Sequence, residues 1–183
     1  MKTYVTYGFF LALGGLLLNV LLYLTGFHST VDKWVAAQWI GGIAGLALGI
    51  VLIVLGIKAR RAEVPLTEEF SYGWALGAGV LVSLFSCLFG IVTNFLYTHF
   101  INTGFQELII QVQTTKWEAA GMSSERIEQA EKMMRSPLGS ILNVVFVFLF
   151  IMFINTVISL IAAAFLKRAA VEDLSVPPVA GAA

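Results

Sequence analysis

Four long runs of apolar residues dominate the hydropathy pattern of this chain. They cover residues 5–26, 35–57, 72–100 and 138–166, and none contains Asp, Glu, Lys or Arg. A helix needs about 20 apolar residues to cross roughly 30 Å of hydrocarbon, and it satisfies its backbone hydrogen bonds internally. The runs are too continuous for the alternating pattern of a membrane β-barrel. The pattern therefore predicts an all-α membrane protein with four transmembrane helices.

Residues 103–136, between the third and fourth runs, have a different pattern. Their apolar positions recur at intervals of three and four in two stretches, Phe105 to Val112 and Ile127 to Met134. Gly121 separates the stretches, and Pro137 follows the second. This pattern predicts an extramembrane amphipathic helical hairpin. In its second helix, Glu128 and Glu131 precede Lys132 and Arg135 by four residues, so we expect two ion pairs along the helix surface.

Composition agrees with a membrane protein. The 183 residues are 58% hydrophobic and 12% charged, against about 25% charged in an ordinary soluble domain. The net charge is zero, which gives no bulk basic surface for nucleic acid. We expect residues 1–168 to form a single domain with a retained N-terminal anchor, and 169–183 to be a disordered tail.

Lysine and arginine in the short flanks predict the orientation. One set lies close to the ends of the apolar runs: Lys2, Lys58, Arg60, Arg61, Lys167 and Arg168. The other set is more dilute and mixed with acids: Lys33, Lys116, Arg126, Lys132 and Arg135. The positive-inside rule therefore predicts that both termini are cytoplasmic.

Small residues recur along each run and predict where helices pack closely in lipid. The clearest rows are Ala37, Gly41, Gly45 and Gly49 in the second run, and Gly79, Ser83, Ser86 and Gly90 in the third. The first run contributes Gly8, Ala12, Gly15 and Asn19, and the fourth Asn155, Ser159 and Ala163. The row from Ala37 to Gly49 is also a candidate homodimer face.

Polar residues within the predicted spans gather toward the outer side. The candidate outer-leaflet polar cluster consists of Asn19, Gln38, Asn94, Asn143 and His99. It is compatible with a small ligand or a lipid headgroup, or with hydrogen bonds between helices. A metal held by His28, Asp32, His99 and Glu107 is conceivable, but no ligand spacing supports it. Cys87 is the single cysteine, so no intramolecular disulfide, zinc motif or haem motif is expected, and no cofactor.

The predicted hairpin offers a candidate partner surface. Its adaptable apolar side chains are Trp117, Ile127, Met133 and Met134. The same segment is also compatible with a solvated connector that lies against the bilayer.

The order of these parts resembles a bacterial four-span membrane family, domain of unknown function 4199. The stretches "LTEEFSYGWALGAG" and "SSERIEQAEKMM" carry the resemblance, which covers roughly residues 3 to 168. The turn "HFINTGF" lacks a proline expected in many relatives. The resemblance implies a bacterial inner-membrane location and an accessory role near envelope-building enzymes, and it supplies no catalytic residue.

Three functions are weighed against the residues. The charge-free spans, the rows of small residues and the external hairpin fit a non-enzymatic accessory or scaffold subunit. Such a subunit would contact the bilayer and either a membrane protein partner or a second copy of this chain. A small-solute or lipid transporter or channel would need oligomerisation, because coupled transporters usually carry ionisable residues inside their spans. An enzyme is disfavoured because no nucleophile–base pairing, phosphate loop or H-E-x-x-H motif is present.

Overall fold

The computed structural model describes residues 1–171, which form six α-helices and one π-helical segment. The helices are α1 (Lys2–Leu24), α2 (Val31–Ala62), α3 (Tyr72–Leu96), α4 (Phe105–Ala119), α5 (Ser124–Arg135) and α6 (Pro137–Leu166), and the π segment η1 (Tyr97–Ile101) continues α3. Four of them, namely α1, α2, α3 with η1, and α6, are long and apolar enough to cross a membrane. The four-span fold with a helical hairpin between the third and fourth spans is therefore confirmed.

Helix bounds differ from the predicted spans where charged residues lie at helix ends. The second helix begins at Val31 and ends at Ala62, so it extends beyond the predicted 35–57 on both sides. Its 32 residues span about 48 Å, more than the roughly 30 Å of hydrocarbon. Asp32 lies in its first turn, and Arg60 and Arg61 in its last. These charges complement the helix dipole and occupy turns outside the apolar stretch.

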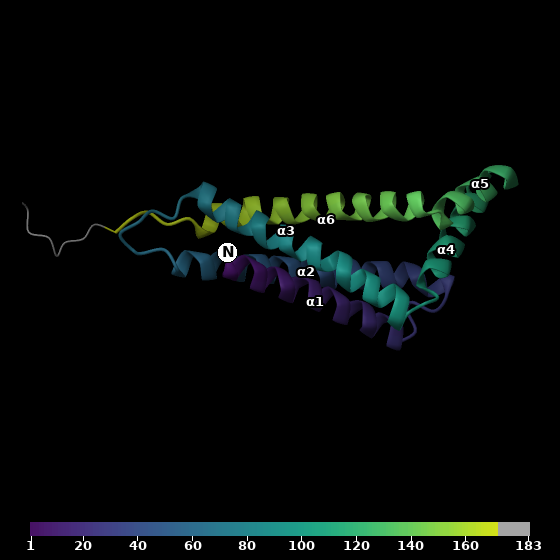
Figure 1. Ribbon diagram of the computed structural model, residues 1–183, viewed down its shortest axis with the longest axis horizontal. Helices are drawn as coiled ribbons and strands as arrows, with labels where there is room; N and C mark the ends of the chain where they lie inside the picture. The colour runs from purple at the N-terminus through teal and green to yellow at the C-terminus, as the bar shows by residue number, and fades with distance from the viewer. Residues whose placement is uncertain (172–183) are drawn as a thin grey trace, which may run out of the picture.

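Helix α3 is the centre of the bundle and packs against α1, α2 and α6. It lies beside α6 near the chain termini and diverges from it toward α4 (Figure 1). Helices α4 and α5 close the far end, between the end of α3 and the start of α6 (Figure 1). We call the end with the start of α1 and the end of α6 the near end, and the end with α4 the far end.

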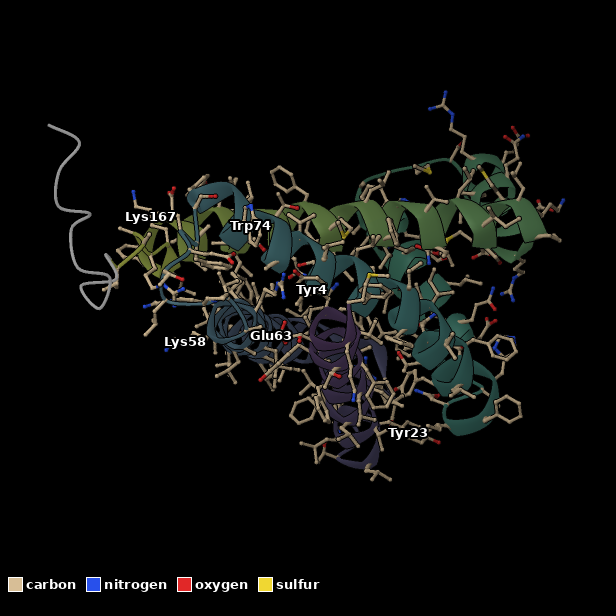
Figure 2. The ribbon with its side chains drawn as sticks, turned by 60° about the vertical axis from the view of Figure 1, so that its left-hand side comes forward. Tyr4, Tyr23, Lys58, Glu63, Trp74 and Lys167 are labelled. Atoms are coloured by element: carbon tan, nitrogen blue, oxygen red, sulfur yellow. The ribbon has the colours of Figure 1, made fainter. Side chains whose placement is uncertain are left out.

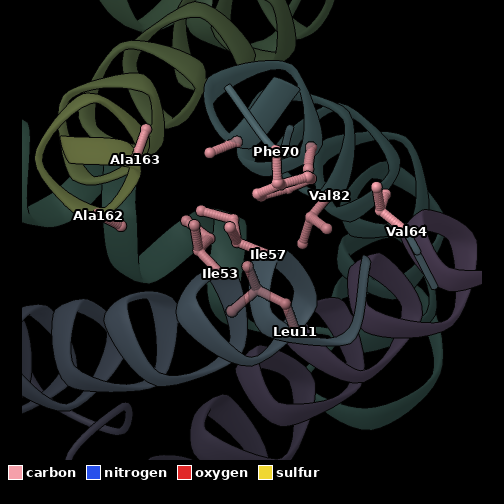
Figure 3. Close-up of a cluster of buried hydrophobic side chains, with 10 residues drawn as sticks. Leu11, Ile53, Ile57, Val64, Phe70, Val82, Ala162 and Ala163 are labelled. Atoms are coloured by element: carbon pink, nitrogen blue, oxygen red, sulfur yellow. The ribbon is translucent and has the colours of Figure 1, made fainter. Parts of the chain in front are cut away.

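The apolar core lies in the near half of the bundle. Its buried side chains come from all four long helices and the α2–α3 loop, and include Leu11, Ile53, Ile57, Phe70, Val82 and Ala163 (Figure 3). Three glycines permit the close crossings there. A Cβ at Gly8 would lie 2.9 Å from the Ser86 nitrogen, one at Gly56 would lie 2.8 Å from Val82 Cγ2, and one at Gly79 would lie 2.7 Å from Ser159 Cβ. Close approach at small residues is how helices associate in lipid.

The near end is closed by a clasp between the α2–α3 loop and the residues after α6. Phe70 and Arg168 exchange two backbone hydrogen bonds of 2.9 and 2.8 Å in an isolated antiparallel bridge. The Arg168 guanidinium Nη2 donates to the carbonyl oxygens of Val64 and Pro65 at 3.0 and 2.7 Å. Val171 donates its N–H to the Leu66 carbonyl oxygen at 2.8 Å. Most of the predicted disordered tail, 169–183, lies outside the described residues, and Val171 at its start is held by this clasp.

Charged side chains gather at the near end. Lys58, Glu63 and Lys167 lie there, whereas Tyr23 lies at the opposite end of α1 from Tyr4 (Figure 2). Glu63 accepts a short hydrogen bond from the Thr3 hydroxyl and forms an ion pair with Arg60 at 2.7 Å. These two contacts lower the pKa of the Glu63 carboxyl, and the hydrogen bond from Thr3 has the larger effect. The end of α2 is thereby tied to the start of α1.

Candidate functional site: a cavity within the helical bundle

A cavity of about 680 Å³ lies between α1, α2, α3 and α6, in the far half of the bundle. Its lining residues come from all four long helices, and α6 diverges from α3 toward this end of the bundle (Figure 1). Small-molecule sites typically have volumes of about 300–1,000 Å³. The cavity is therefore large enough for a ligand of considerable size, and it lies at the depth of the spans.

The lining of the cavity is mostly apolar but includes several uncharged polar side chains. Seven lining residues carry hydrogen-bonding side chains: Asn19, Ser86, Thr93, Asn94, Tyr97, Asn143 and Asn155. Of the cavity-lining residues in the described part of the chain, none is ionisable at neutral pH. The cavity is thus polar without being charged.

These polar groups occupy two depths. Asn19, Asn94 and Asn143 lie near the far ends of their helices and form the outer ring of the cavity. Asn155 and Ser86 lie deeper, and each is only 7% exposed. Twelve residues separate Asn143 from Asn155, which corresponds to about 18 Å along α6. The cavity is therefore elongated along the bundle.

The two deep side chains have no hydrogen-bond partner among residues 1–171. Other buried serines of the bundle bond to their own helix: Ser83 Oγ donates to the Gly79 carbonyl at 2.8 Å, and Ser159 Oγ to that of Asn155 at 2.7 Å. The side chains of Ser86 and Asn155 make no such bond within the described chain and line the cavity instead. Their polar atoms are accessible from the cavity, so a molecule that occupies this end can hydrogen bond with both side chains.

A smaller hollow of about 280 Å³ adjoins the cavity at the far end. The two share Gly15, Asn19 and three glycines of α2. The smaller hollow is also lined by His28, Trp34, Gln38 and Phe105. Phe105 belongs to α4, so the helical hairpin contributes to this boundary.

A cluster of aromatic side chains joins the hairpin to the bundle at the hollow. The His28 ring lies 5.5 Å from Trp34 and 5.2 Å from Phe105 between centroids, and Tyr97 packs edge-on against Phe105 at 5.2 Å. Asn102 Nδ2 donates to the Tyr97 hydroxyl at 3.0 Å, and the Tyr97 hydroxyl lies 2.6 Å from His28 Nδ1. Because Tyr97 accepts from Asn102, its own O–H is free to donate to a neutral His28. Burial lowers the pKa of His28, which favours the same neutral form.

Tyr97 reaches this cluster because the helix changes its winding there. The segment Tyr97–Ile101 is π-helical, and Asn102 N–H bonds back to the Tyr97 carbonyl at 2.7 Å. A π turn inserts one extra residue and rotates the side chains that follow, and such turns are frequent at functional sites. No pattern in the sequence marks this turn.

The five residues of the candidate outer-leaflet polar cluster divide among three places. Asn19, Asn94 and Asn143 line the large cavity. Gln38 lines the smaller hollow beside Asn19. His99 borders neither: its exposed ring stacks on Phe95 at 4.3 Å and its Nδ1 lies 3.1 Å from the Phe95 carbonyl oxygen.

The two predicted packing rows, one in α2 and one in α3, are each closely packed at some positions and open at others. Ala37, Gly49, Gly79, Ser83 and Ser86 are buried, and a Cβ at Gly41 would touch only Leu22 at 3.4 Å. Gly45 and Gly90 have no neighbouring atom within 4 Å of an added Cβ, and both line the cavity. The helices therefore pack closely along only part of each row.

The hairpin is held by contacts between helices. Glu128 and Lys132 form the predicted pair at 2.7 Å, but the predicted pair of Glu131 with Arg135 is wrong. Arg135 instead donates to both carboxylate oxygens of Glu107 in α4, at 2.7 and 3.0 Å, and Glu131 accepts from Thr114 at 2.5 Å. The folded hairpin offers each residue a partner on the facing helix. Of the candidate partner surface, Trp117, Ile127 and Met134 are half-buried and Met133 is 51% exposed.

The four residues considered for a metal are not brought together. His28 is in the aromatic cluster, His99 stacks on Phe95, and Glu107 binds Arg135. Among the described residues, no group of three or more His, Cys, Asp or Glu side chains is arranged to hold an ion.

Sequence reasoning identified the outer amides of the cavity but not its deep end. Ser86 and Asn155 were assigned to helix packing. The available signal was an asparagine in the middle of a charge-free span, which is costly in lipid unless it finds a partner.

Comparison with known proteins agrees with this four-span structure. A family model described as protein of unknown function (DUF4199) matches residues 6–168. The chain belongs to this family. The match runs from α1 to the clasp after α6, so the DUF4199 region includes the whole cavity and the hairpin. No curated protein and no solved structure matches the chain.

Proposed function

We propose that this protein is a non-catalytic accessory subunit of the bacterial inner membrane that holds a lipid-soluble molecule inside its four-helix bundle. The 680 Å³ cavity at the depth of the spans carries the proposal. The space is partly open to the surroundings of the bundle, so a molecule can enter it, and its polar deep end fits an occupant that hydrogen bonds. We expect that occupant to come from the bilayer that surrounds the helices.

The chemistry of the site supports binding over catalysis. Two ionisable groups at the far end already have partners, since His28 bonds to Tyr97 and Glu107 to Arg135. Cys87 lines the cavity, but among the described residues no histidine or carboxylate lines it with this thiol to act as a base. The lining offers hydrogen-bonding groups and apolar surface, and both can bind a ligand without chemical reaction.

Filling the cavity tests this function. Gly45 and Gly90 have no atom within 4 Å of an added Cβ, so Gly45→Ile and Gly90→Ile are chosen to place a side chain in the cavity. Gly77 also has open space but does not line the cavity, which makes Gly77→Ile the matched control. Native mass spectrometry of the purified protein should show a retained lipid-mass adduct for the parent and Gly77→Ile proteins that both cavity variants lose. A parent protein without any adduct, or filled variants that keep it, contradicts the proposal.

The charge distribution supports cytoplasmic termini. Lys58 and Lys167 lie at the near end (Figure 2). Arg60 and Arg61 in the last turn of α2 and Arg168 after α6 belong to the same end, whereas basic residues of the hairpin are interleaved with acids. The cavity would then open toward the outer leaflet. A fluorescent protein fused after the last residue should fluoresce in cells, and a periplasmic phosphatase fused there should be inactive. The reverse result would invert the orientation.

A scaffold role is a second candidate, favoured by α5. This helix separates an apolar face from a charged one, yet within the described chain none of its residues is buried. Of the candidate partner surface, Met133 is therefore the residue of α5 most available to a membrane partner, while Ile127 and Met134 of α5 and Trp117 of α4 are half-buried. A photocrosslinker at Met133 should capture one protein in intact cells that a crosslinker at Glu128 does not. Equal labelling from both positions would remove the basis for this role.

A further inference from the structure

We propose that the cavity selects uncharged amphiphiles, whose polar end hydrogen bonds to Asn155 and Ser86 while the apolar chain extends toward the far end. This inference rests on the proposed function, because it names the class of molecule that the cavity holds. The ligand is defined by one neutral oxygen-bearing group, such as a hydroxyl or a carbonyl, on a narrow hydrocarbon chain.

The polar end is assigned to the deep site by the unmet hydrogen-bonding capacity there. Asn155 and Ser86 are more than nine-tenths buried, line the cavity from α6 and α3, and have no side-chain partner among residues 1–171. Together the amide and the hydroxyl supply up to three donors and the corresponding acceptors. One hydroxyl or carbonyl oxygen between them would satisfy both side chains, whereas a methyl group would satisfy neither.

The absence of charge from the lining sets the second criterion. No lining residue in the described chain is an acid, a base or a histidine, so a charged headgroup would be desolvated without a counterion. This desolvation is strongly unfavourable even after the surroundings relax. A phosphate or carboxylate headgroup is therefore disfavoured at the deep end.

The shape of the cavity sets the third criterion. It continues from Asn155 for about 18 Å along α6 to Asn143, and between these residues α6 contributes apolar side chains such as Val147 and Ile151. On α2, Gly45 lines the cavity and has no atom within 4 Å of an added Cβ, so it leaves the space open. An extended chain fits this geometry.

Cys87 provides the readout, because it is the single cysteine and lines the cavity beside Ser86. The full-length protein is reconstituted in phosphatidylcholine vesicles, and the rate of Cys87 alkylation by N-ethylmaleimide is measured with tetradecanol, tetradecane or tetradecyl sulfate at equal mole fractions. Tetradecanol should slow alkylation about threefold to tenfold more than tetradecane, as expected for one or two hydrogen bonds. Tetradecyl sulfate should give no protection.

Variants assign the preference to the deep site. Ser86→Ala and Asn155→Leu should abolish the difference between tetradecanol and tetradecane. Ser83→Ala, a buried serine of the same helix outside the cavity, should keep it. If tetradecane protects as well as tetradecanol, or tetradecyl sulfate protects equally, this inference is overturned while the proposed function stands. If no probe slows alkylation, the cavity holds only water and both are overturned.

Discussion

Glycine has two opposite effects on packing in this bundle, and substitution by alanine separates them. At Gly79 the new Cβ would lie 2.7 Å from Ser159 Cβ, whereas at Gly45 it would meet open space. Gly79→Ala should lower the free energy of unfolding by about 1–3 kcal/mol through overpacking. Gly45→Ala should leave it unchanged or raise it by up to about 1 kcal/mol, because alanine is the better helix former. Thermal unfolding in detergent measures both, and equal destabilisation would contradict the arrangement of α3 and α6.

His28 should make the far end sensitive to acid. Burial lowers its pKa in the folded protein below the ordinary value of 6.5, so the unfolded chain binds more protons in the interval between the two values. The resulting stability is complete above pH 6.5 and is lost as the pH falls toward the folded pKa. The unfolding temperature should therefore decrease between about pH 7 and about pH 5. His28→Gln should reduce this decrease, and His99→Gln, an exposed control, should preserve it.

At the scale of elements, the ion pair between Glu107 and Arg135 fixes α5 against α4. Both side chains are half exposed, so we expect Arg135→Ala to affect the hairpin locally without changing the unfolding temperature of the bundle. Amide hydrogen exchange in α5 should become faster. Lys132→Ala, which removes the pair within α5, is the control and should have less effect. An unchanged exchange rate in Arg135→Ala would show that the pair does not hold the hairpin.

The same contact predicts a response to acid. Hydrogen bonds from Arg135 lower the pKa of Glu107, so the contribution of the pair is complete above the ordinary carboxyl pKa of 4.5 and is lost as the pH falls through the folded value. Faster exchange in α5 should thus appear at a lower pH than the loosening caused by His28. Arg135→Ala should remove this acidic transition.

The junction of α5 and α6 depends on one glycine. Ser136 caps α6 by accepting the Gly139 N–H at 3.0 Å, and a Cβ at Gly139 would overlap the Met133 carbonyl oxygen. Gly139→Ala should therefore force the two helices apart and lower the free energy of unfolding by about 1–3 kcal/mol. Gly104→Ala, at the start of α4, meets its nearest atom at 3.9 Å and is the tolerant control. Similar unfolding temperatures for the two variants would contradict the close contact between Gly139 and Met133 at this junction.

Patterns within one element were predictable, and relations between elements were not. Hydropathy and charge located the four spans and the hairpin, because both properties repeat along a single helix. Arg135 was paired with Glu131 because the helix-pair rule compares residues four apart in one helix. The rule does not include Glu107 of α4, which the folded hairpin brings to Arg135. Gly45 and Gly49 belong to one row at the same spacing and both line the cavity, yet a Cβ at Gly49 would lie 3.5 Å from Asn155 Oδ1, whereas a Cβ at Gly45 would have no neighbour within 4 Å. The surroundings of these two positions depend on how the neighbouring helices pack, which the spacing of the row does not encode.

For the whole molecule, the two ends of the bundle differ in how they are closed. The near end has an apolar core, close helix crossings and the clasp of Arg168. The far end has the cavity, the aromatic cluster around His28 and the hairpin. Hydrogen exchange should therefore be slower in the near half of α3 than in its far half, because cooperative opening follows local packing density.

Arg168 offers the sharpest test of this asymmetry. Its Nη2 donates to the Val64 and Pro65 carbonyls, so it links the end of α6 to the loop between α2 and α3. Arg168→Ala leaves these carbonyls without their donor and should lower the free energy of unfolding by about 1.5–3 kcal/mol, the range for a hydrogen bond to a charged group. The neighbouring Lys167→Ala, whose side chain is exposed, should cost far less. Exchange of the Phe70 amide, which bonds to the Arg168 carbonyl, should accelerate in Arg168→Ala while amides of α4 keep their rates. If α4 loosens equally, the bundle opens as one unit and the two ends are not independently closed.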